Sequence, residues 1–189
     1  MAVREPIDPP IPAWDASGEL KPVGKLEVHR RGLRHPAVSV FVLQGDRILV
    51  QKRAASKYHT PGLWANTCCT HPTWGESAAD CARRRLAEEL GITGLDLRHV
   101  GQAEYRAEVS GLAGPLTEHE VVEVFVGEAA APVSIRLNAV EVAAVRWVTL
   151  ADLEAEIARQ PQDFTPWLRI YLQEHATMIF RGSAVSRGV

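Results

Sequence analysis

The feature that most constrains the fold is a capped amphipathic helix that directly follows a short strand-like segment. Apolar residues within positions 78–90 recur every three or four residues, which predicts a helix with one buried face. These residues are Ala78, Cys81, Ala82, Leu86 and Leu90. Ser77 and Asp80 resemble a capping box at its start, and Gly91 is a typical residue for its end. The preceding segment WANTCCTH is predicted to be a short strand.

The rest of the chain predicts strands mixed with helices. Residues 37–53 form two β-rich runs separated by Gly45-Asp46, which is a hairpin signal. Further strands are expected near 95–107, 119–127 and 141–148. Thr149 is expected to cap a helix over residues 150–160, and Pro166 to begin another that extends to residue 180. This order predicts an α+β fold with a mixed sheet.

We expect one domain, because 189 residues are enough to bury a core without disulfides. Residues 1–20 contain PIDPPIP and are predicted to form an extended, proline-rich N-terminal arm, which we hypothesise covers the site once substrate binds. The domain is expected to span residues 21–180 and to be followed by a loose tail at 181–189.

The charge distribution suggests an anionic ligand. The net charge of −2 argues against a dedicated nucleic-acid or membrane binder. Nine Lys or Arg residues lie between positions 21 and 57, against two acidic residues, which fits either an anion site or a solvated basic face. With three cysteines within fourteen positions, no apparent signal peptide and no apolar run of membrane length, we expect a cytoplasmic protein.

The helix at 78–90 also carries a motif. Arg85 and Glu89 share a face because they lie about one turn apart, which alone is typical of an ion-paired solvent face. However, Glu76, seven residues, Arg84 and then RLAEELGI resemble the Nudix box, whose carboxylates hold divalent metal against a diphosphate. Thr70 replaces the leading glycine of the box, and Arg85 replaces a glutamate that hydrolases use. The resemblance implies a Nudix-type α/β/α sandwich, whereas the replacement at Arg85 argues against hydrolysis.

Two further pairs of residues have the spacing of one strand face. Cys69 precedes His71 by two positions, and Glu118 precedes Glu120 by two, so each pair can point to one side of its strand. Together with His29 and His35, the three histidines and two carboxylates would suit Mn²⁺, Mg²⁺ or Zn²⁺. The alternative is that these residues never meet. A zinc site of Cys68, Cys69, His71 and Cys81 is disfavoured because adjacent cysteines lack the usual spacer.

From about residue 25 to residue 167 the chain resembles the type I isopentenyl-diphosphate isomerases, Nudix-fold enzymes that lost the hydrolytic box residue. The resemblance lies in LEVHRRGLRHPAVSVFV, QKRAASKYHTPGLWANTCCTHPTWGES, RRLAEELGI, EYRAE, EHEVVEVF and FTPWL. It implies conversion of isopentenyl diphosphate to dimethylallyl diphosphate, a step of isoprenoid biosynthesis, by protonation and deprotonation at opposite faces of the alkene. Two alternatives stay open: a Nudix hydrolase of a diphosphate, and an inactive Nudix module that binds a ligand or protein.

The resemblance also implies roles for individual residues. Cys69 and Glu120 would transfer the two protons, with Tyr105 assisting Glu120, and Trp167 would shield the carbocation. Phosphate oxygens would be bound by Lys25, Arg53, Lys57 and Arg85. Mg²⁺ would bridge the diphosphate, Glu89 and the carbonyl of Cys69. A second metal would bind His29, His35, His71, Glu118 and Glu120. We expect a monomer or weak dimer whose only partner is the small-molecule substrate.

Overall fold

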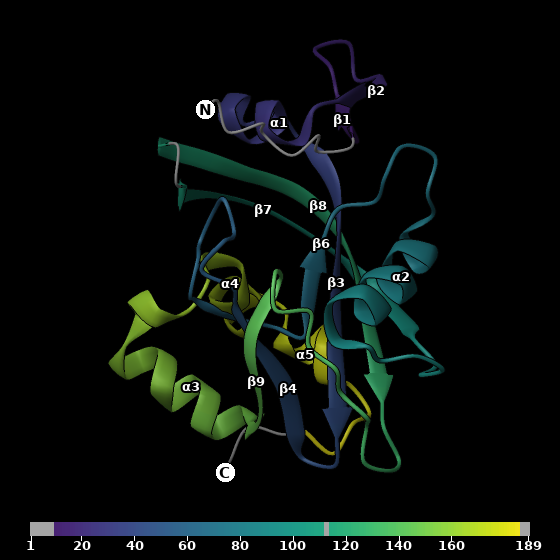
Figure 1. Ribbon diagram of the computed structural model, residues 1–189, viewed down its shortest axis with the longest axis vertical. Coiled ribbons are helices and arrows are strands. Elements are labelled where there is room, and N and C mark those ends of the chain that lie inside the picture. Colours follow the sequence, from purple (N-terminus) through teal and green to yellow (C-terminus); the bar gives the residue numbers. More distant parts are fainter. Residues whose placement is uncertain (1–9, 112–113, 186–189) are drawn as a thin grey trace.

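A mixed β-sheet forms the centre of the protein in the computed structural model, which describes residues 10–111 and 114–185 (Figure 1). Within those residues the sheet has seven strands. Five of them follow the order β5-β4-β3-β8-β7; in addition, β6 pairs with β3 and β9 pairs with β4. The strands are β3 (His35–Gln44), β4 (Arg47–Arg53), β5 (Trp64–Ala65), β6 (Cys68–Thr70), β7 (Arg98–Gly111), β8 (Gly114–Glu128) and β9 (Val142–Thr149). Strands β3 and β8 run parallel, and the other pairs are antiparallel. The predicted mixed sheet is confirmed.

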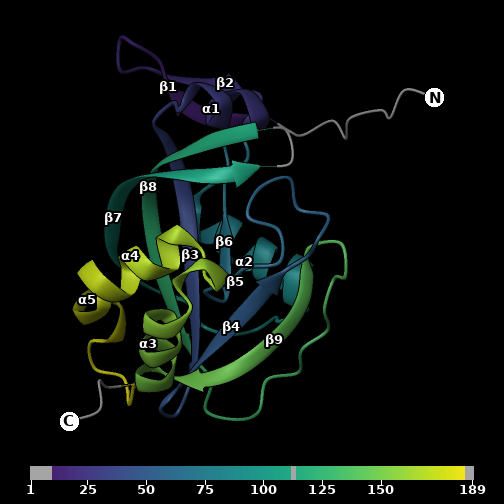
Figure 2. The same cartoon turned by 90° about the vertical axis from the view of Figure 1, so that its left-hand side faces the viewer.

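Helices cover both faces of this sheet, as the turned view in Figure 2 shows. Helix α2 (Ala78–Leu90) packs on one face; α3 (Leu150–Arg159), α4 (Pro166–Glu174) and α5 (Ala176–Phe180) contribute to the core on the other. Side chains of β3 alternate between the two faces. Val38, Val40 and Val42 pack in the core beneath α2, whereas Phe41 and Leu43 pack in the core on the side of α3, α4 and α5. The α/β/α sandwich is therefore confirmed.

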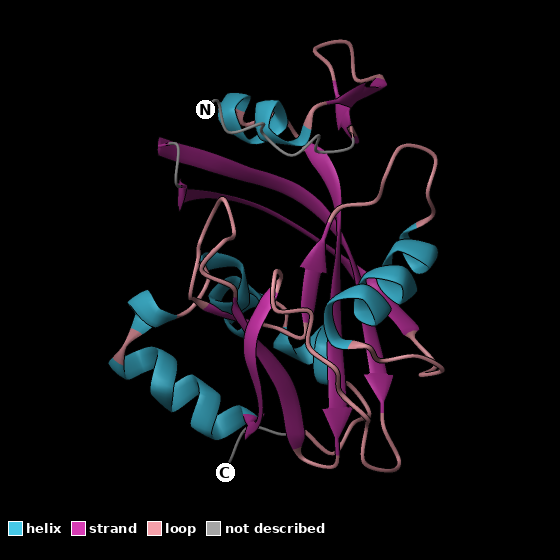
Figure 3. Cartoon of the chain, viewed as in Figure 1, coloured by secondary structure: helices cyan, strands magenta, loops and turns pink. Residues whose placement is uncertain are grey.

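The local predictions are largely confirmed (Figure 3). The hydroxyl of Ser77 accepts a hydrogen bond from the Asp80 amide, Gly91 ends α2 with φ +67°, and Thr149 caps α3. The predicted strand WANTCCTH is instead two short strands, β5 and β6. The predicted last helix is interrupted at His175, between α4 and α5, and a short 3₁₀ turn (Pro161–Asp163) precedes α4.

A short helix that the sequence reasoning missed, α1 (Lys25–Arg31), packs against β8 at one end of the sheet (Figure 1). It ends at Gly32, whose φ of +60° favours glycine. With only seven residues it shows too little periodicity to be recognised, although Arg30, Arg31 and Gly32 are a typical helix end.

The part of the predicted N-terminal arm that is described is extended but not free. Strands β1 (Ile11–Trp14) and β2 (Leu20–Val23) form a hairpin, and Ile11 and Ala13 are buried against Val28 of α1. Residues 1–9 of the arm and 186–189 of the tail lie outside the described residues. Among those described, no helix is long and apolar enough to cross a membrane.

Candidate active site and metal centre

The strand register brings the candidate residues together. In the parallel pair β3/β8, His35 lies opposite Glu120, and in the antiparallel pair β7/β8, Tyr105 lies opposite the same Glu120. In the pair β3/β6, Ser39 lies opposite Cys69. Because side chains alternate along a strand, Glu118 points to the same side as Glu120.

Three histidines and two glutamates converge as a buried cluster. His29, His35, His71, Glu118 and Glu120 each offer one ligand atom, and these atoms all lie within 4.8 Å of one another. They come from α1, the start of β3, the segment after β6 and, for both glutamates, β8. Residues about ninety positions apart in the sequence therefore lie together, which rules out the alternative that they never meet.

The hydrogen bonds of this cluster suit a divalent metal. The Nδ1 atoms of His29 and His35 lie 2.6 Å and 2.7 Å from the backbone carbonyl oxygens of Lys25 and Leu33, so each is expected to donate there. Each Nε2 lone pair is then left facing the cluster, the usual arrangement for a metal-binding histidine. Within the described residues, His29 Nε2 and both oxygens of Glu118 are buried without an aligned hydrogen bond. Nitrogen and oxygen donors of this kind fit Mn²⁺, Mg²⁺ or Zn²⁺.

The protonation states fit the same conclusion. Burial favours the neutral form of Glu118, but the adjacent His59 and His29 outweigh this and hold its pKa well below the usual range. For Glu120, burial and the charge of Glu118 act upward, yet the adjacent His35 and His71 leave its pKa lowered. Burial lowers the pKa of His71 to about 3. Charged carboxylates and a neutral imidazole are what a metal requires of its ligands.

A thiol and a phenol lie beside this cluster. Cys69 Sγ lies 3.2 Å from Ser39 Oγ, which in turn lies 2.8 Å from the Tyr171 hydroxyl. The hydroxyl of Tyr105 donates to Oε2 of Glu120. Burial, reinforced by the charge of Glu120, raises the pKa of Cys69 and of Tyr105 well above their ordinary values. Both groups are therefore protonated at neutral pH.

The two adjacent cysteines separate as expected. Cys68 and Cys81 are buried in the apolar core beneath α2, whereas Cys69 faces the opposite side of β6. All three are free cysteines, and neither Cys68 nor Cys81 belongs to the metal-ligand cluster. The disfavoured four-ligand zinc site is not formed.

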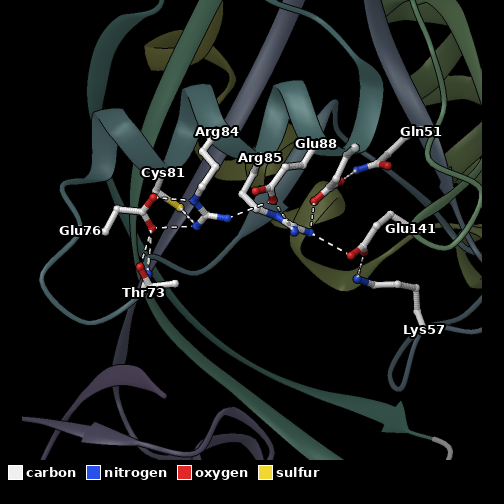
Figure 4. A network of polar contacts seen from close by, with 10 residues as sticks. Gln51, Lys57, Thr73, Glu76, Cys81, Arg84, Arg85, Glu88 and Glu141 are labelled. Carbon is white, nitrogen blue, oxygen red and sulfur yellow. Dashed lines mark hydrogen bonds and ion pairs between the residues drawn. The ribbon is translucent and has the colours of Figure 1, made fainter. Parts of the chain in front are cut away.

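A network of ion pairs lies along α2 and reaches the loop after β4 (Figure 4). Arg85 Nη2 lies 2.7 Å from Glu89 Oε1 and 3.3 Å from Glu141 Oε1, and Lys57 Nζ lies 2.5 Å from Glu141 Oε2. Gln51 donates to the other oxygen of Glu89 at 3.0 Å. Burial raises the pKa of Glu141, but Lys57 and Arg85 together lower it to about 2, so this carboxylate stays charged.

At the start of the box, Glu76 pairs with Arg84 and is not a member of the metal-ligand cluster. Arg84 makes two hydrogen bonds to Glu76, at 2.6 Å and 2.7 Å, and Glu76 also accepts from the Thr73 amide (Figure 4). These bonds, led by that of Arg84, lower the pKa of Glu76 to about 2. The pair closes the loop before α2, so its role is structural.

One cavity is lined by most of the predicted site residues. Its lining residues are Lys25, Arg53, Lys57, His59, Cys69, Thr70, His71, Arg85, Glu118, Glu120 and Trp167. Arg53 lies over the ring of Trp167, with 5.4 Å between its central carbon and the ring centroid. Glu89 and Tyr105 do not line the cavity but contact Arg85 and Glu120, which do.

Sequence reasoning missed several residues of this region, among them Ser39 and Tyr171 beside Cys69. His59 lines the cavity, and Gln51 and Glu141 hold Glu89, Lys57 and Arg85. His59 lies in a loop and Glu141 just before β9, where no periodicity assigns a direction to a side chain. The only available signal was their type: a histidine and an acid close to predicted site segments.

The comparisons agree with this geometry. The NUDIX domain profile matches residues 33–168, and the chain therefore belongs to the Nudix family. Among solved structures, a Deinococcus radiodurans protein superposes with a TM-score of 0.62 at 16% identity, over 79% of this chain and 88% of that chain. A MutT NUDIX hydrolase of Burkholderia pseudomallei superposes with a TM-score of 0.57 at 23% identity, over 75% of this chain and 98% of that chain. At these identities the likeness shows the fold alone.

Curated relatives narrow the family further. An isopentenyl-diphosphate Delta-isomerase of Dinoroseobacter shibae is 59% identical over 93% of this chain and 98% of its own length. The proteins of that name from Cereibacter sphaeroides and Rhodobacter capsulatus are 59% and 58% identical, each over 90% of this chain and 94% of theirs. Within the Nudix family, the chain belongs to the isopentenyl-diphosphate Delta-isomerases.

Proposed function

We propose that the protein converts isopentenyl diphosphate to dimethylallyl diphosphate. The observation that carries the proposal is that a thiol, Cys69, and a carboxylate, Glu120, line one cavity together with Trp167 and a set of cations. The reaction adds a proton to the terminal alkene carbon and removes one from the carbon next to the oxygen-bearing carbon. Between these steps the substrate carries positive charge at a tertiary carbon, which must be kept from water.

Cys69 and Glu120 are the two proton-transfer groups of this proposal. The raised pKa of Cys69 keeps its thiol protonated, so in this state it can give a proton to carbon, whereas taking a proton from carbon would require the thiolate. Glu120 is ionised and held by Tyr105, so it suits the complementary transfer. Trp167 is expected to stabilise the cationic carbon through the face of its ring.

The diphosphate is expected to bind Lys25, Arg53, Lys57 and Arg85, which line the cavity. Mg²⁺ bound to the diphosphate, Glu89 and the Cys69 carbonyl would neutralise part of its charge. In Nudix hydrolases the residue at the position of Arg85 is a glutamate that activates water for attack on the diphosphate. A guanidinium at this position would bind the diphosphate but could not activate water. This difference favours isomerisation over hydrolysis.

The cluster of His29, His35, His71, Glu118 and Glu120 is proposed to hold a second divalent ion, Mn²⁺, Mg²⁺ or Zn²⁺. Such an ion would polarise Glu120 and fix its position. The chain's own residues orient the cluster: the carbonyls of Lys25 and Leu33 set the two imidazole rings, and Tyr105 holds the second oxygen of Glu120. We further propose a cytoplasmic enzyme, since a free catalytic thiol suits a reducing compartment.

The test is proton NMR of isopentenyl diphosphate in D₂O with the purified protein and Mg²⁺, beside Cys69→Ala and a chelated sample. Formation of deuterated dimethylallyl diphosphate, lost in both controls, is the expected result. Release of phosphate without isomerisation would establish a Nudix hydrolase instead. An unchanged spectrum, with Cys69 and Glu120 replaceable without effect, would indicate a binding module.

A further inference from the structure

His59 is a buried histidine of the cavity to which neither the sequence motifs nor the proposed mechanism gives a role. It lies in the loop between β4 and β5, residues 54–63, and its side chain is 7% exposed. Its Nε2 lies 2.8 Å from Oε1 of Glu118, while His29 Nε2 lies 3.0 Å from Oε2 of the same carboxylate. His59 is not a member of the five-residue cluster, so it approaches Glu118 from outside it.

The ring of His59 faces Glu118 through Nε2, which lies 2.8 Å from Oε1 without forming an aligned hydrogen bond. Nε2 is therefore the nitrogen placed to carry the hydrogen in a contact with this carboxylate. Nδ1 is then the unprotonated nitrogen, and within the described residues it is buried without a hydrogen-bond partner. The ring is therefore directed by Glu118 and not by a competing polar group at its other nitrogen.

The backbone around His59 keeps the ring in this place. Arg53 Nη2 donates to the carbonyl oxygen of His59 at 3.1 Å, and the Thr60 amide donates to Ser110 at the end of β7. His59 also forms an isolated bridge with Gly111. Thr60 has a φ of +45°, which is unfavourable for a β-branched residue and persists only where surrounding contacts impose it.

We propose that His59 is a positioning residue for the metal centre: it binds one oxygen of Glu118, so that the other is directed into the cluster beside His29. The inference rests on the proposed function, because it requires that the cluster binds a divalent ion. Polar partners of metal-binding carboxylates fix their orientation, and loss of such a partner weakens metal binding by about 10- to 100-fold.

The test measures Mn²⁺ binding to metal-stripped protein by calorimetry. His59→Phe keeps an aromatic ring but removes the donor, so its Kd should rise by about 10- to 100-fold. His59→Gln carries an amide N–H near the position of Nε2 and should restore most of the affinity. The control is the same substitution at His99, whose side chain is 50% exposed and pairs with Glu123 outside the cavity. His99→Phe should bind Mn²⁺ as the unmodified protein does.

Each outcome is decisive. Equal Kd values for the unmodified protein and His59→Phe would overturn the role of His59 alone, and equal weakening in His59→Phe and His59→Gln would show that ring shape matters and the donor does not. No Mn²⁺ binding by the unmodified protein would overturn the metal centre itself. Should His59→Phe fail to fold by circular dichroism, His59→Asn replaces it, because its shorter amide cannot reach Glu118; affinity retained in that variant would refute the proposal.

Discussion

Arg85, which lines the cavity, and Glu89 form a largely buried ion pair one turn apart on α2, with 2.7 Å between Nη2 and Oε1. Their side chains are 18% and 5% exposed. A surface pair of this spacing contributes little to stability, whereas a desolvated guanidinium beside a cavity is available to bind an anion. The proposed function therefore gives the pair a binding role beyond the ion-paired solvent face that its spacing alone suggests.

Replacing Arg85 by glutamate should raise the KM for isopentenyl diphosphate at least about tenfold, because it removes a partly buried phosphate ligand and adds a like charge. Steady-state kinetics measure this, and a phosphate assay shows whether a glutamate here restores hydrolysis. The control is Arg83→Glu, since Arg83 is 58% exposed and pairs only with Asp80 among the ion pairs of the described residues. Reduced activity with neither a raised KM nor phosphate release would make the anchoring role wrong.

The two adjacent cysteines provide a matched pair for the proton transfer. Cys69→Ala should lower kcat by about 10²- to 10⁴-fold, since it removes a general acid or base. Cys68→Ala removes a similar volume from the opposite face of β6 and should leave kcat nearly unchanged, at a stability cost of about 1 kcal/mol. Both variants are compared by single-turnover NMR and thermal unfolding. Equal losses of kcat in the two variants would show that packing, not thiol chemistry, explains the effect.

Much of this site was predictable where the geometry is local. The spacing of Cys69 and His71, and of Glu118 and Glu120, fixes a shared strand face, and the capping residues Ser77 and Gly91 fix the ends of α2. Such features depend on a few neighbouring residues, so the sequence contains all the information that they need.

Whether these residues come together in one site depends on strand pairing between segments that are distant in the sequence. His35 lies beside Glu120 only because β3 and β8 run parallel in that register, and Tyr105 reaches Glu120 only through β7. Without the family resemblance, no pattern in the chain specifies either register. His59 was missed for the same reason, since the contacts of its loop with Ser110 and Gly111 are long-range.

Glu141→Gln should raise the KM for isopentenyl diphosphate about fivefold with little change in kcat. The Glu141 carboxylate holds Lys57 and Arg85 together, and without it the flexible Lys57 side chain must be ordered on binding, at about 0.5–1.5 kcal/mol. The matched control is Glu156→Gln, which removes a similarly buried carboxylate from Arg146 away from the cavity. A lower KM would instead mean that Glu141 acts mainly by repelling the diphosphate.

The ion pair of Glu76 and Arg84 should make stability depend on pH in a defined window. Hydrogen bonds from Arg84 hold the pKa of Glu76 at about 2, below its ordinary 4.5. A lowered pKa in the folded state means that the stabilisation is fully present above about pH 4.5 and is lost as the pH falls toward 2. Glu76→Gln should therefore lower the free energy of unfolding by about 2 kcal/mol at pH 7 and have little effect near pH 2.

Urea denaturation of both proteins at several pH values between 2 and 7 measures this difference directly. The control is Glu27→Gln, because Glu27 pairs with Arg31 on the surface, where both side chains are more than half exposed. Exposed pairs of this kind contribute about 0–1 kcal/mol, so that variant should remain close to the unmodified protein throughout. A difference for Glu76→Gln that stays constant down to pH 2 would show that the loss comes from packing before α2 and not from the charge of Glu76.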